Sequence, residues 1–312
     1  MSSGNLLFLF VMLLGPLVSI SSSNWVICWV GLELSFLGAI PLLLSDSGFM
    51  SLSKESVIKY FCIQALGSGL LMLGGVMYFM DPMIFEFSEM ILIFSLFIKL
   101  GVFPMHFWVP GIASGLNWFA LFILLGWQKI PPFALLINLC ENSYSLGYVV
   151  MVIGGISALV GALIGLNQTN LRAMLGGSSI AHTGWSCVGV VCGGLWTYFL
   201  LYMASFLLLM IFVMVKDDFM MGLMILGLSG LPPFVMFIGK WSILKSVLIE
   251  GYSFFFLTLP ILSALLSLFF YLKFFYSFYL SSAIFNSSKS KYSYICSTIL
   301  LSVSGVMYVM LF

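Results

Sequence analysis

The sequence has very little charge. Only 7% of its 312 residues are charged, whereas 62% are hydrophobic, and the mean hydropathy is +1.20. Soluble chains carry about 25% charged residues, so this composition excludes a soluble globular protein. The formal net charge is +1, which provides no basic surface for nucleic acid, and we expect no nucleic-acid partner. The sequence is therefore predicted to be a polytopic membrane protein.

Signals for a cleaved leader, for disulfides and for cofactors are also missing. The first lysine is Lys54, so we expect the amino end to be retained as a span rather than removed as a secretory signal. The six cysteines occur singly in or beside apolar runs, which is typical of small buried side chains. Cys187, Cys192 and His182 lack tetrahedral metal spacing, and we find no Gly-rich phosphate loop and no iron–sulfur Cys cluster. We expect neither a cofactor nor redox chemistry in this chain.

Long apolar runs make up most of the chain. Backbone groups in hydrocarbon must be hydrogen-bonded within their own segment, so these runs are predicted to be helices of about 20 residues. The sequence predicts an all-α membrane helix bundle in a single domain, 1–312, with about eleven spans. Their predicted ranges are 4–21, 24–44, 56–80, 87–108, 115–140, 147–166, 172–193, 195–215, 219–250, 253–280 and 293–312.

The charges in the predicted loops separate by sign. One face receives the basic residues Lys54, Lys59, Arg172, Lys216, Lys289 and Lys291. The opposite face receives the acids Asp81, Glu86, Glu89, Glu141 and Glu250, and no Lys or Arg. By the positive-inside rule, the amino end is predicted to lie on the matrix or cytoplasmic side and the carboxyl end on the other.

Four ionisable residues lie well inside apolar runs: Glu33, Lys99, Lys129 and Lys240. Inserting each of them costs about 2.5–3.5 kcal/mol, and such residues usually mark ion or proton pathways. The alternative is a structural ion pair or a side chain that reaches the membrane surface. We favour that alternative for Lys59 and Lys273, because both lie within reach of a helix end. Glu89, near the start of its helix, is also predicted to be interfacial.

Two of the predicted helices are interrupted by Gly and Pro. The helix at 87–108 contains Leu100-Gly-Val-Phe-Pro104, and the helix at 219–250 contains Ser229-Gly-Leu-Pro-Pro233. Broken backbone at membrane depth persists only where it lines a cavity or is buried in protein. Each broken helix is the fourth of five consecutive helices. The chain is therefore predicted to hold two inverted five-helix repeats, about 4–140 and 147–280, followed by a last helix at about 293–312.

Glu33 and Lys99 are predicted to form a proton switch. Burial disfavours the charged form of a lysine. A carboxylate about 4 Å away favours it again by about 4 kcal/mol at an effective dielectric constant of ~20. If the carboxylate moved away, Lys99 would release its proton.

The two histidines, His106 after the first break and His182 in mid-helix, have three interpretations. They could ligate one haem, they could be hydrogen-bonded structural side chains, or they could relay protons, because histidine titrates near neutral pH. Hydrogen-bonded side chains are favoured over haem ligands. Among the functional interpretations, proton relay is favoured for both.

Small residues gather in the helix predicted at 147–166. They are Gly154, Gly155, Ala158, Gly161, Ala162 and Gly165. Such spacing lets two helices approach closely. It predicts tight helix packing rather than a ligand site.

Several motifs together resemble the antiporter-like membrane subunits of NADH–ubiquinone oxidoreductase, respiratory complex I. The resemblance covers nearly the whole chain. The motifs are Trp29-Val-Gly-Leu-Glu33, Lys59-Tyr-Phe with Gln64-Ala65, Lys99-Leu-Gly with Pro104-Met-His106-Phe-Trp-Val-Pro110, Trp127-Gln-Lys129, Gly165-Leu-Asn-Gln-Thr with Leu171-Arg172, Ser178-Ser-Ile with His182 and Gly184-Trp185, and Gly230-Leu-Pro-Pro with Lys240-Trp241.

The resemblance implies a subunit that translocates protons, while NADH, FMN, iron–sulfur clusters and ubiquinone bind to other subunits. Family members have fourteen helices, and a mitochondrially encoded animal form lacks the first three, which agrees with eleven here. Glu33 matches the modulating glutamate and Lys99 its paired lysine, whereas Lys129 matches the linking lysine and Lys240 the lysine of the exit half-channel. The implied partners are other membrane-arm subunits, including neighbouring antiporter-like chains and the small chain 4L, and lipids such as cardiolipin. The implied location is the mitochondrial inner membrane, with the amino end in the matrix.

Two positions depart from the family pattern, and two other functions stay open. Ala173 stands where the family usually has a basic residue, and Gly177 replaces an aromatic one, so water access at that helix end is expected to differ. A cation/proton antiporter that works alone is the first alternative, although no carboxylate lies beside a break to bind a sodium ion. A scaffold subunit that does not pump is the second.

Overall fold

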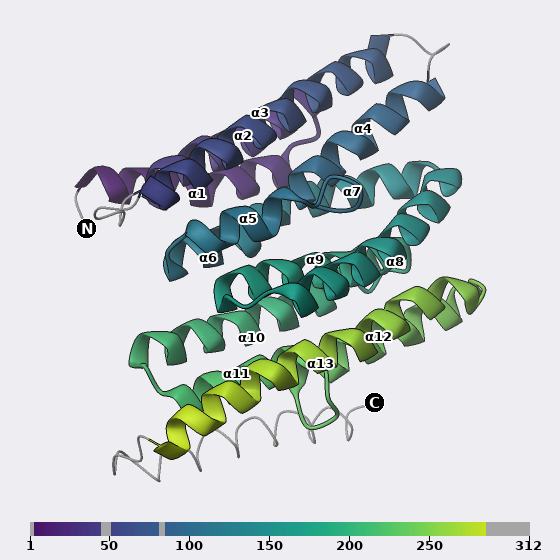
Figure 1. Cartoon of the computed structure of the whole chain (residues 1–312). Coiled ribbons are helices and arrows are strands. Elements are labelled where there is room, and N and C mark those ends of the chain that lie inside the picture. The colour runs from purple at the N-terminus through teal and green to yellow at the C-terminus, as the bar shows by residue number, and fades with distance from the viewer. Residues whose placement is uncertain (1–2, 45–50, 81–84, 285–312) are drawn as a thin grey trace.

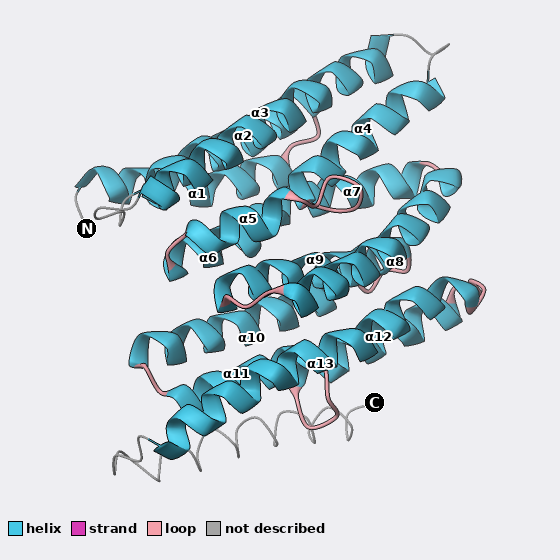
Figure 2. Cartoon of the chain, in the orientation of Figure 1, coloured by secondary structure: helices cyan, strands magenta, loops and turns pink. Residues whose placement is uncertain are grey.

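The computed structural model describes residues 3–44, 51–80 and 85–284, and every regular element within them is a helix (Figure 1; Figure 2). The prediction of an all-helical fold is thus confirmed. Seven of the described helices are long and apolar enough to cross a membrane. The predicted last helix at 293–312 lies outside the described residues, as do Asp81, Lys289 and Lys291.

The helices follow one another with short connections. The first part of the chain contains α1 (Ser3–Ser21), α2 (Trp25–Leu44), α3 (Ser51–Met80), α4 (Phe85–Leu100), α5 (Trp108–Gly115), α6 (Trp118–Leu125), the 3-10 turn η2 (Trp127–Lys129) and α7 (Ile130–Asn142). The second part contains α8 (Tyr144–Asn167), α9 (Leu171–Val191), α10 (Leu195–Val215), α11 (Asp218–Ser229), α12 (Val235–Ile249) and α13 (Phe255–Ile284).

Both predicted breaks are present. The first separates α4 from α5, with Gly101 at φ +71° and a cis peptide bond between Phe103 and Pro104. The second separates α11 from α12, with Gly230 at φ +78°. Glycine suits both positions, because other residues are strained at positive φ. Each break thus ends a helix beside a buried lysine.

The span predicted at 115–140 is present as one membrane-length stretch, Trp118–Asn142, but a third break interrupts the helix that was expected there. The structure has α6, then the 3-10 turn η2, then α7. Pro131 and Pro132 account for the interruption, since proline has no backbone N–H and fits best in the first turn of a helix. The pair therefore starts α7 instead of continuing α6. This break places Lys129 at the junction.

Helix α9 is the most enclosed element. It packs against α5, α7, α8, α10, α12 and α13, and Figure 1 shows it between the first and the last helices. Every residue from Ala173 to Val190 is buried. Its hydroxyl side chains tolerate this burial because they donate to carbonyls one turn earlier in the same helix, as Ser179 does to Gly176 O at 2.8 Å. Polar groups can therefore lie at the centre of the molecule.

Glycines allow α8 and α9 to touch through their backbones. A Cβ on Gly184 would lie 2.5 Å from the backbone N of Ala158, and a Cβ on Gly161 would overlap the backbone N of Ala181. The prediction of tight packing by the small residues of this helix is thus confirmed.

Replacing Gly161 by valine is expected to separate α8 from α9. Overpacking typically costs about 1–3 kcal/mol, and backbone atoms of α9 cannot turn aside as a flexible side chain can. We expect less assembled protein on native gels and a lower thermal midpoint. Gly69→Val is the control, because a Cβ on Gly69 meets no atom within 4 Å. Equal behaviour of the two variants would contradict the packing argument.

Candidate functional site

Glu33 and Lys99 form an ion pair in which the lysine is buried and the glutamate is half-buried. Lys99 lies in the last turn of α4, and Glu33 lies in the middle of α2. The distance from Lys99 Nζ to Glu33 Oε1 is 3.3 Å, and the two side chains are 4% and 20% exposed. From α3, Gln64 donates a hydrogen bond from Nε2 to Lys99 O at 3.3 Å. The structure thus brings together the two residues that the sequence suggested as a pair.

Lys129 lies in the third break and has a carbonyl as its partner. Its Nζ donates to Ser179 O of α9 at 3.3 Å, and the residue is 3% exposed. The preceding residue, Gln128, donates from Nε2 to Ser35 O at 3.0 Å. Ser35 is two residues from Glu33 on α2, so the amide of Gln128 joins the neighbourhood of the ion pair to that of Lys129.

His182 is enclosed by tyrosines. Its Nδ1 lies 2.7 Å from the hydroxyl of Tyr198 on α10, and its Nε2 lies 3.2 Å from the hydroxyl of Tyr271 on α13. The ring of Tyr202 lies against the imidazole with a centroid separation of 4.8 Å. Both ring nitrogens are therefore engaged, and neither is free to ligate haem iron in this arrangement.

Lys240 is held by the second break. Its Nζ donates to Ser229 O, the last residue of α11, at 2.6 Å. The ammonium group also lies 5.8 Å from the ring centroid of Trp185 on α9, at the edge of cation–π range. The backbone of Gly230 runs along the lysine, since a Cβ there would lie 3.0 Å from Lys240 Nζ.

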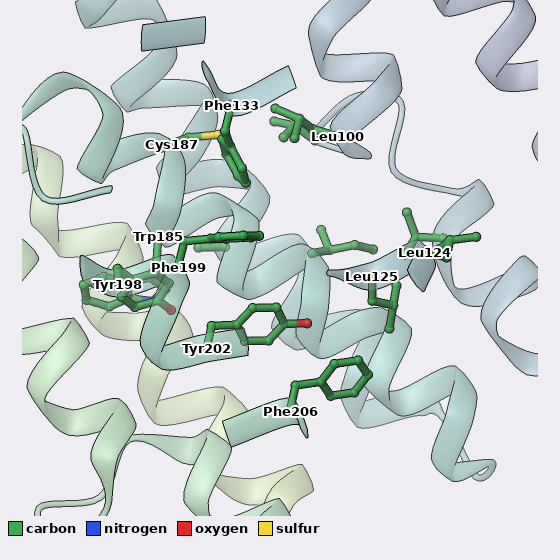
Figure 3. Close-up of a cluster of buried hydrophobic side chains, with 14 of the residues drawn as sticks. Leu100, Leu124, Leu125, Phe133, Trp185, Cys187, Tyr198, Phe199, Tyr202 and Phe206 are labelled. Carbon is green, nitrogen blue, oxygen red and sulfur yellow. The ribbon is translucent and has the colours of Figure 1, made fainter. Parts of the chain in front are cut away.

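One face of α9 connects Lys129, His182 and Lys240. Ser179, His182 and Trp185 follow one another at a spacing of three residues, which places them on the same side of the helix. Ser179 contacts Lys129, and Trp185 contacts Lys240. Trp185 and Tyr198 also lie in the buried apolar cluster that Figure 3 shows. The polar groups therefore form a line across the molecule that starts at Glu33 and ends at Lys240.

His106 is not part of that line. It lies in the first break, is 3% exposed, and packs against Phe107 with ring centroids 4.1 Å apart. Among the described residues, its Nδ1 has no hydrogen-bond partner. The structure therefore places His106 near the end of α4 without joining it to Lys99 by a hydrogen bond or an ion pair.

The other charged residues singled out in the sequence lie away from the buried line. Lys59 pairs with Glu55 at 2.6 Å on the exposed side of α3. Lys273 is exposed and reaches Gln168 O at 3.5 Å, in the connection between α8 and α9. Both fit the prediction of side chains that extend to a helix end. Glu89 also lies near a helix end, in the first turns of α4, but it is covered by protein and only 4% exposed.

Three residues of the site were missed in the sequence: Gln128, Tyr198 and Tyr271. Gln128 had a signal, since it is a polar residue beside Lys129 in an apolar run. The two tyrosines had no such signal in the sequence. The chain holds 13 tyrosines, and the positions of Tyr198 and Tyr271 do not distinguish them from the others. Only the packing of α10 and α13 on α9 brings them to His182.

Comparison with known proteins agrees with this architecture. The family described as NADH:quinone oxidoreductase/Mrp antiporter, TM, matches residues 22–218. The NADH-ubiquinone oxidoreductase chain 2 of Albinaria caerulea is 37% identical over 272 residues, which are 87% of this chain and 88% of that protein. The chain 2 of Branchiostoma floridae is 36% identical over 298 residues, with 86% and 83% covered.

A solved structure shares the fold. A chain in the structure of respiratory complex I from Thermus thermophilus with bound aureothin superposes with a TM-score of 0.76 at 21% identity. The match covers 96% of this chain and 76% of that one.

Proposed function

Because this chain belongs to the NADH:quinone oxidoreductase/Mrp antiporter family, and within it to the NADH-ubiquinone oxidoreductase chain 2 proteins, we propose that it is a proton-translocating membrane subunit of NADH:ubiquinone oxidoreductase. The observation that carries the proposal is the line of ionisable groups formed by half-buried Glu33 and buried Lys99, Lys129, His182 and Lys240. A chain that only filled space in a membrane would not retain cations at such cost.

Glu33 and Lys99 are proposed to load and release the first proton. The carboxylate stabilises the ammonium form of Lys99 at a separation of 3.3 Å. Lys99 also lies at the carboxyl end of α4, where the helix dipole favours a cation. Movement of Glu33 away from Lys99 removes the ion pair, which is the larger of the two interactions, and leaves the helix dipole. Lys99 then gives its proton to the next group.

Lys129, His182 and Lys240 are proposed to carry the proton onward. Lys240 lies at the carboxyl end of α11, so its ammonium form is favoured by the helix dipole and by Ser229 O. Lys129 instead precedes the amino end of α7, where the dipole is unfavourable for a cation. This difference favours transfer from Lys129 toward Lys240. His106, buried in the first break, is proposed as a further relay.

The packing pattern supports two five-helix repeats, about 4–140 and 147–280. In the first part, α1 packs on α2, α3 on α4 and α5, and α4 on α7. In the second part, α8 packs on α9, α10 on α11 and α12, and α11 on α13. The two sets share this order of contacts, with α13 in the place of α7, and five spans in each would place the sets in opposite orientations. We propose the segment at about 293–312 as the last of eleven spans.

Contacts at one end of the bundle support the proposed topology. Arg172, at the start of α9, donates to Leu116 O between α5 and α6. Leu52, in the first turn of α3, lies beside Gly115 at the same junction. Two basic segments that the positive-inside rule assigns to one face therefore share an end. We propose that this end and the amino end face the matrix of the mitochondrion, across its inner membrane.

The partners are proposed from the family. They are other membrane-arm subunits, including antiporter-like chains and the small chain 4L, and lipids such as cardiolipin. NADH, FMN, iron–sulfur clusters and ubiquinone are proposed to bind elsewhere in the complex. Among the described residues, no group of three or more His, Cys, Asp or Glu side chains lies together in a way that could hold a metal ion.

Replacing Lys240 by methionine tests the function. Methionine has similar length but carries no proton, so we expect NADH-driven proton export through this chain to fall by about tenfold or more. The measurement is the number of protons exported per NADH oxidised in vesicles that contain the assembled complex. Lys273→Met is the control, because Lys273 is exposed and lies away from the buried line.

Two outcomes would contradict the proposal. An unchanged proton-to-NADH ratio in the assembled Lys240→Met complex would favour a scaffold that does not pump. Migration of the native protein as a small particle on native gels, rather than as a very large assembly, would favour a cation/proton antiporter that works alone.

A further inference from the structure

The imidazole of His182 is held by two hydroxyl groups from two different helices. The Tyr198 hydroxyl on α10 lies 2.7 Å from Nδ1, and the Tyr271 hydroxyl on α13 lies 3.2 Å from Nε2. All three residues are buried. The two nitrogens therefore face these hydroxyls and not the solvent.

The hydrogen-bonding capacity of these groups allows two arrangements. A neutral imidazole has one N–H donor and one bare nitrogen acceptor, whereas each phenol can donate and accept. When Nδ1 carries the hydrogen, Tyr198 accepts from it and Tyr271 donates to Nε2. When Nε2 carries the hydrogen, Tyr271 accepts and Tyr198 donates to Nδ1. Interchange of the two arrangements moves hydrogens along the whole group in one direction.

The two tyrosines lie beside neighbours in sequence of the two lysine sites. Tyr198 packs against the residue before Lys240, since a Cβ on Gly239 would lie 3.0 Å from Tyr198 Cδ2. Tyr271 lies beside the side chain of Ser178, the neighbour in sequence of the residue whose carbonyl holds Lys129. His182 itself lies between the two lysine sites, because Ser179, one turn before it on α9, contacts Lys129 and Trp185, one turn after it, lies under Lys240.

We propose that the hydroxyls of Tyr271 and Tyr198 are the entry and exit groups through which His182 passes a proton from Lys129 to Lys240. The proposal deepens the function given above and rests on it. In the step, Tyr271 O accepts a proton from the Lys129 side as its own hydrogen moves to Nε2. The hydrogen on Nδ1 moves to Tyr198 O, and the hydroxyl hydrogen of Tyr198 leaves toward Lys240. One proton enters, one leaves, and no electron is transferred.

The step leaves the group in its other arrangement. Nε2 now carries the hydrogen, and Tyr198 donates to Nδ1. A second proton can follow in the same direction only after the imidazole has returned to the tautomer with its hydrogen on Nδ1 and both hydroxyls have turned. A single proton therefore passes for each return of the imidazole to its first tautomer.

Tyr202 provides a matched control. Its ring packs on the same imidazole at 4.8 Å with a tilt of 36°, whereas Tyr198 and Tyr271 contact the imidazole through their hydroxyls. Replacing Tyr202 by phenylalanine removes a hydroxyl from an equally buried side chain and leaves the relay intact. Each Tyr→Phe change removes one hydroxyl of the same size. The changes differ in whether that hydroxyl is one that contacts His182.

The experiment compares Tyr198→Phe, Tyr271→Phe and Tyr202→Phe in the assembled complex in vesicles. We expect each of the first two to lower proton export per NADH by about tenfold or more through this chain, as loss of a positioned proton-transfer group does. Tyr202→Phe is expected to keep the native ratio. Tyr198→His, which retains a donor and an acceptor, is expected to restore part of the export that Tyr198→Phe loses. Native ratios in Tyr198→Phe and Tyr271→Phe would overturn the proposal.

The results separate this inference from the proposed function. If Lys240→Met stops export while the two phenylalanine variants pump normally, the function stands and the tyrosine relay is wrong. If Lys240→Met also pumps normally, the function itself is wrong. The solvent deuterium effect on proton export by the unmodified complex is a second measurement, which does not depend on the variants assembling. A relay that moves several hydrogens predicts a slower rate in deuterated water, and an unchanged rate contradicts it.

Discussion

Replacing Lys99 by arginine is expected to give an assembled complex in which this chain no longer exports protons. Arginine keeps the positive charge and can pair with Glu33, from which Lys99 Nζ lies 3.3 Å away. Free arginine, however, holds its proton with a pKa about three units above that of free lysine, so the neutral form is about 10³-fold rarer. A structural ion pair would survive this change, whereas a proton switch would not.

The measurement is proton export per NADH in vesicles, together with the amount of assembled complex on native gels. We expect assembly close to the native level and a loss of export of at least about tenfold. Lys59→Arg serves as the control, because Lys59 forms an exposed pair with Glu55. Native export by the Lys99→Arg complex would show that the pair between Glu33 and Lys99 is only structural.

Replacing Lys129 by methionine is expected to change stability and function in opposite directions. Lys129 is 3% exposed, and its one hydrogen bond among the described residues is to Ser179 O. A buried cation without a carboxylate is costly, and replacing buried charges by apolar side chains of similar size often stabilises a protein by about 1–4 kcal/mol. We therefore expect a higher thermal midpoint. Proton export is expected to fall by about tenfold or more, because the link between Lys99 and His182 is lost.

Thermal unfolding of the purified complex, followed with proton export, checks both parts. Lys273→Met is the control, since removing an exposed charge usually changes stability by less than about 0.5 kcal/mol. A lower midpoint for Lys129→Met, or full export, would show that the lysine holds the third break together rather than carrying protons.

The sequence predicted the parts of the site that depend on local chemistry. Lysines inside apolar runs, and Gly and Pro beside two of them, identified Lys99 and Lys240 and the two breaks. The pair between Glu33 and Lys99 could be suggested because Glu33 is the one acid well inside a span. These signals are readable because charge and proline are costly within a membrane helix.

The remaining parts depend on packing that no local pattern contains. The third break was missed because Pro131 and Pro132 fit equally well inside a predicted span and at the start of a helix. Tyr198 and Tyr271 lie 73 positions apart in the sequence and meet His182 only because α10 and α13 pack on α9. The enclosure of α9 was also unforeseen, since its residues are no more apolar than those of helices on the outside.

The burial of α9 has a mechanical consequence. Ser179, His182 and Trp185 belong to one stiff rod, and the glycines of α8 leave that rod no freedom to bend toward its neighbour. A slide or rotation of α9 shifts three partners at the same moment: the carbonyl that holds Lys129, the imidazole between the phenols, and the indole under Lys240. A displacement of α9 at one end would therefore reach all three partners at once and couple sites that no single side chain connects.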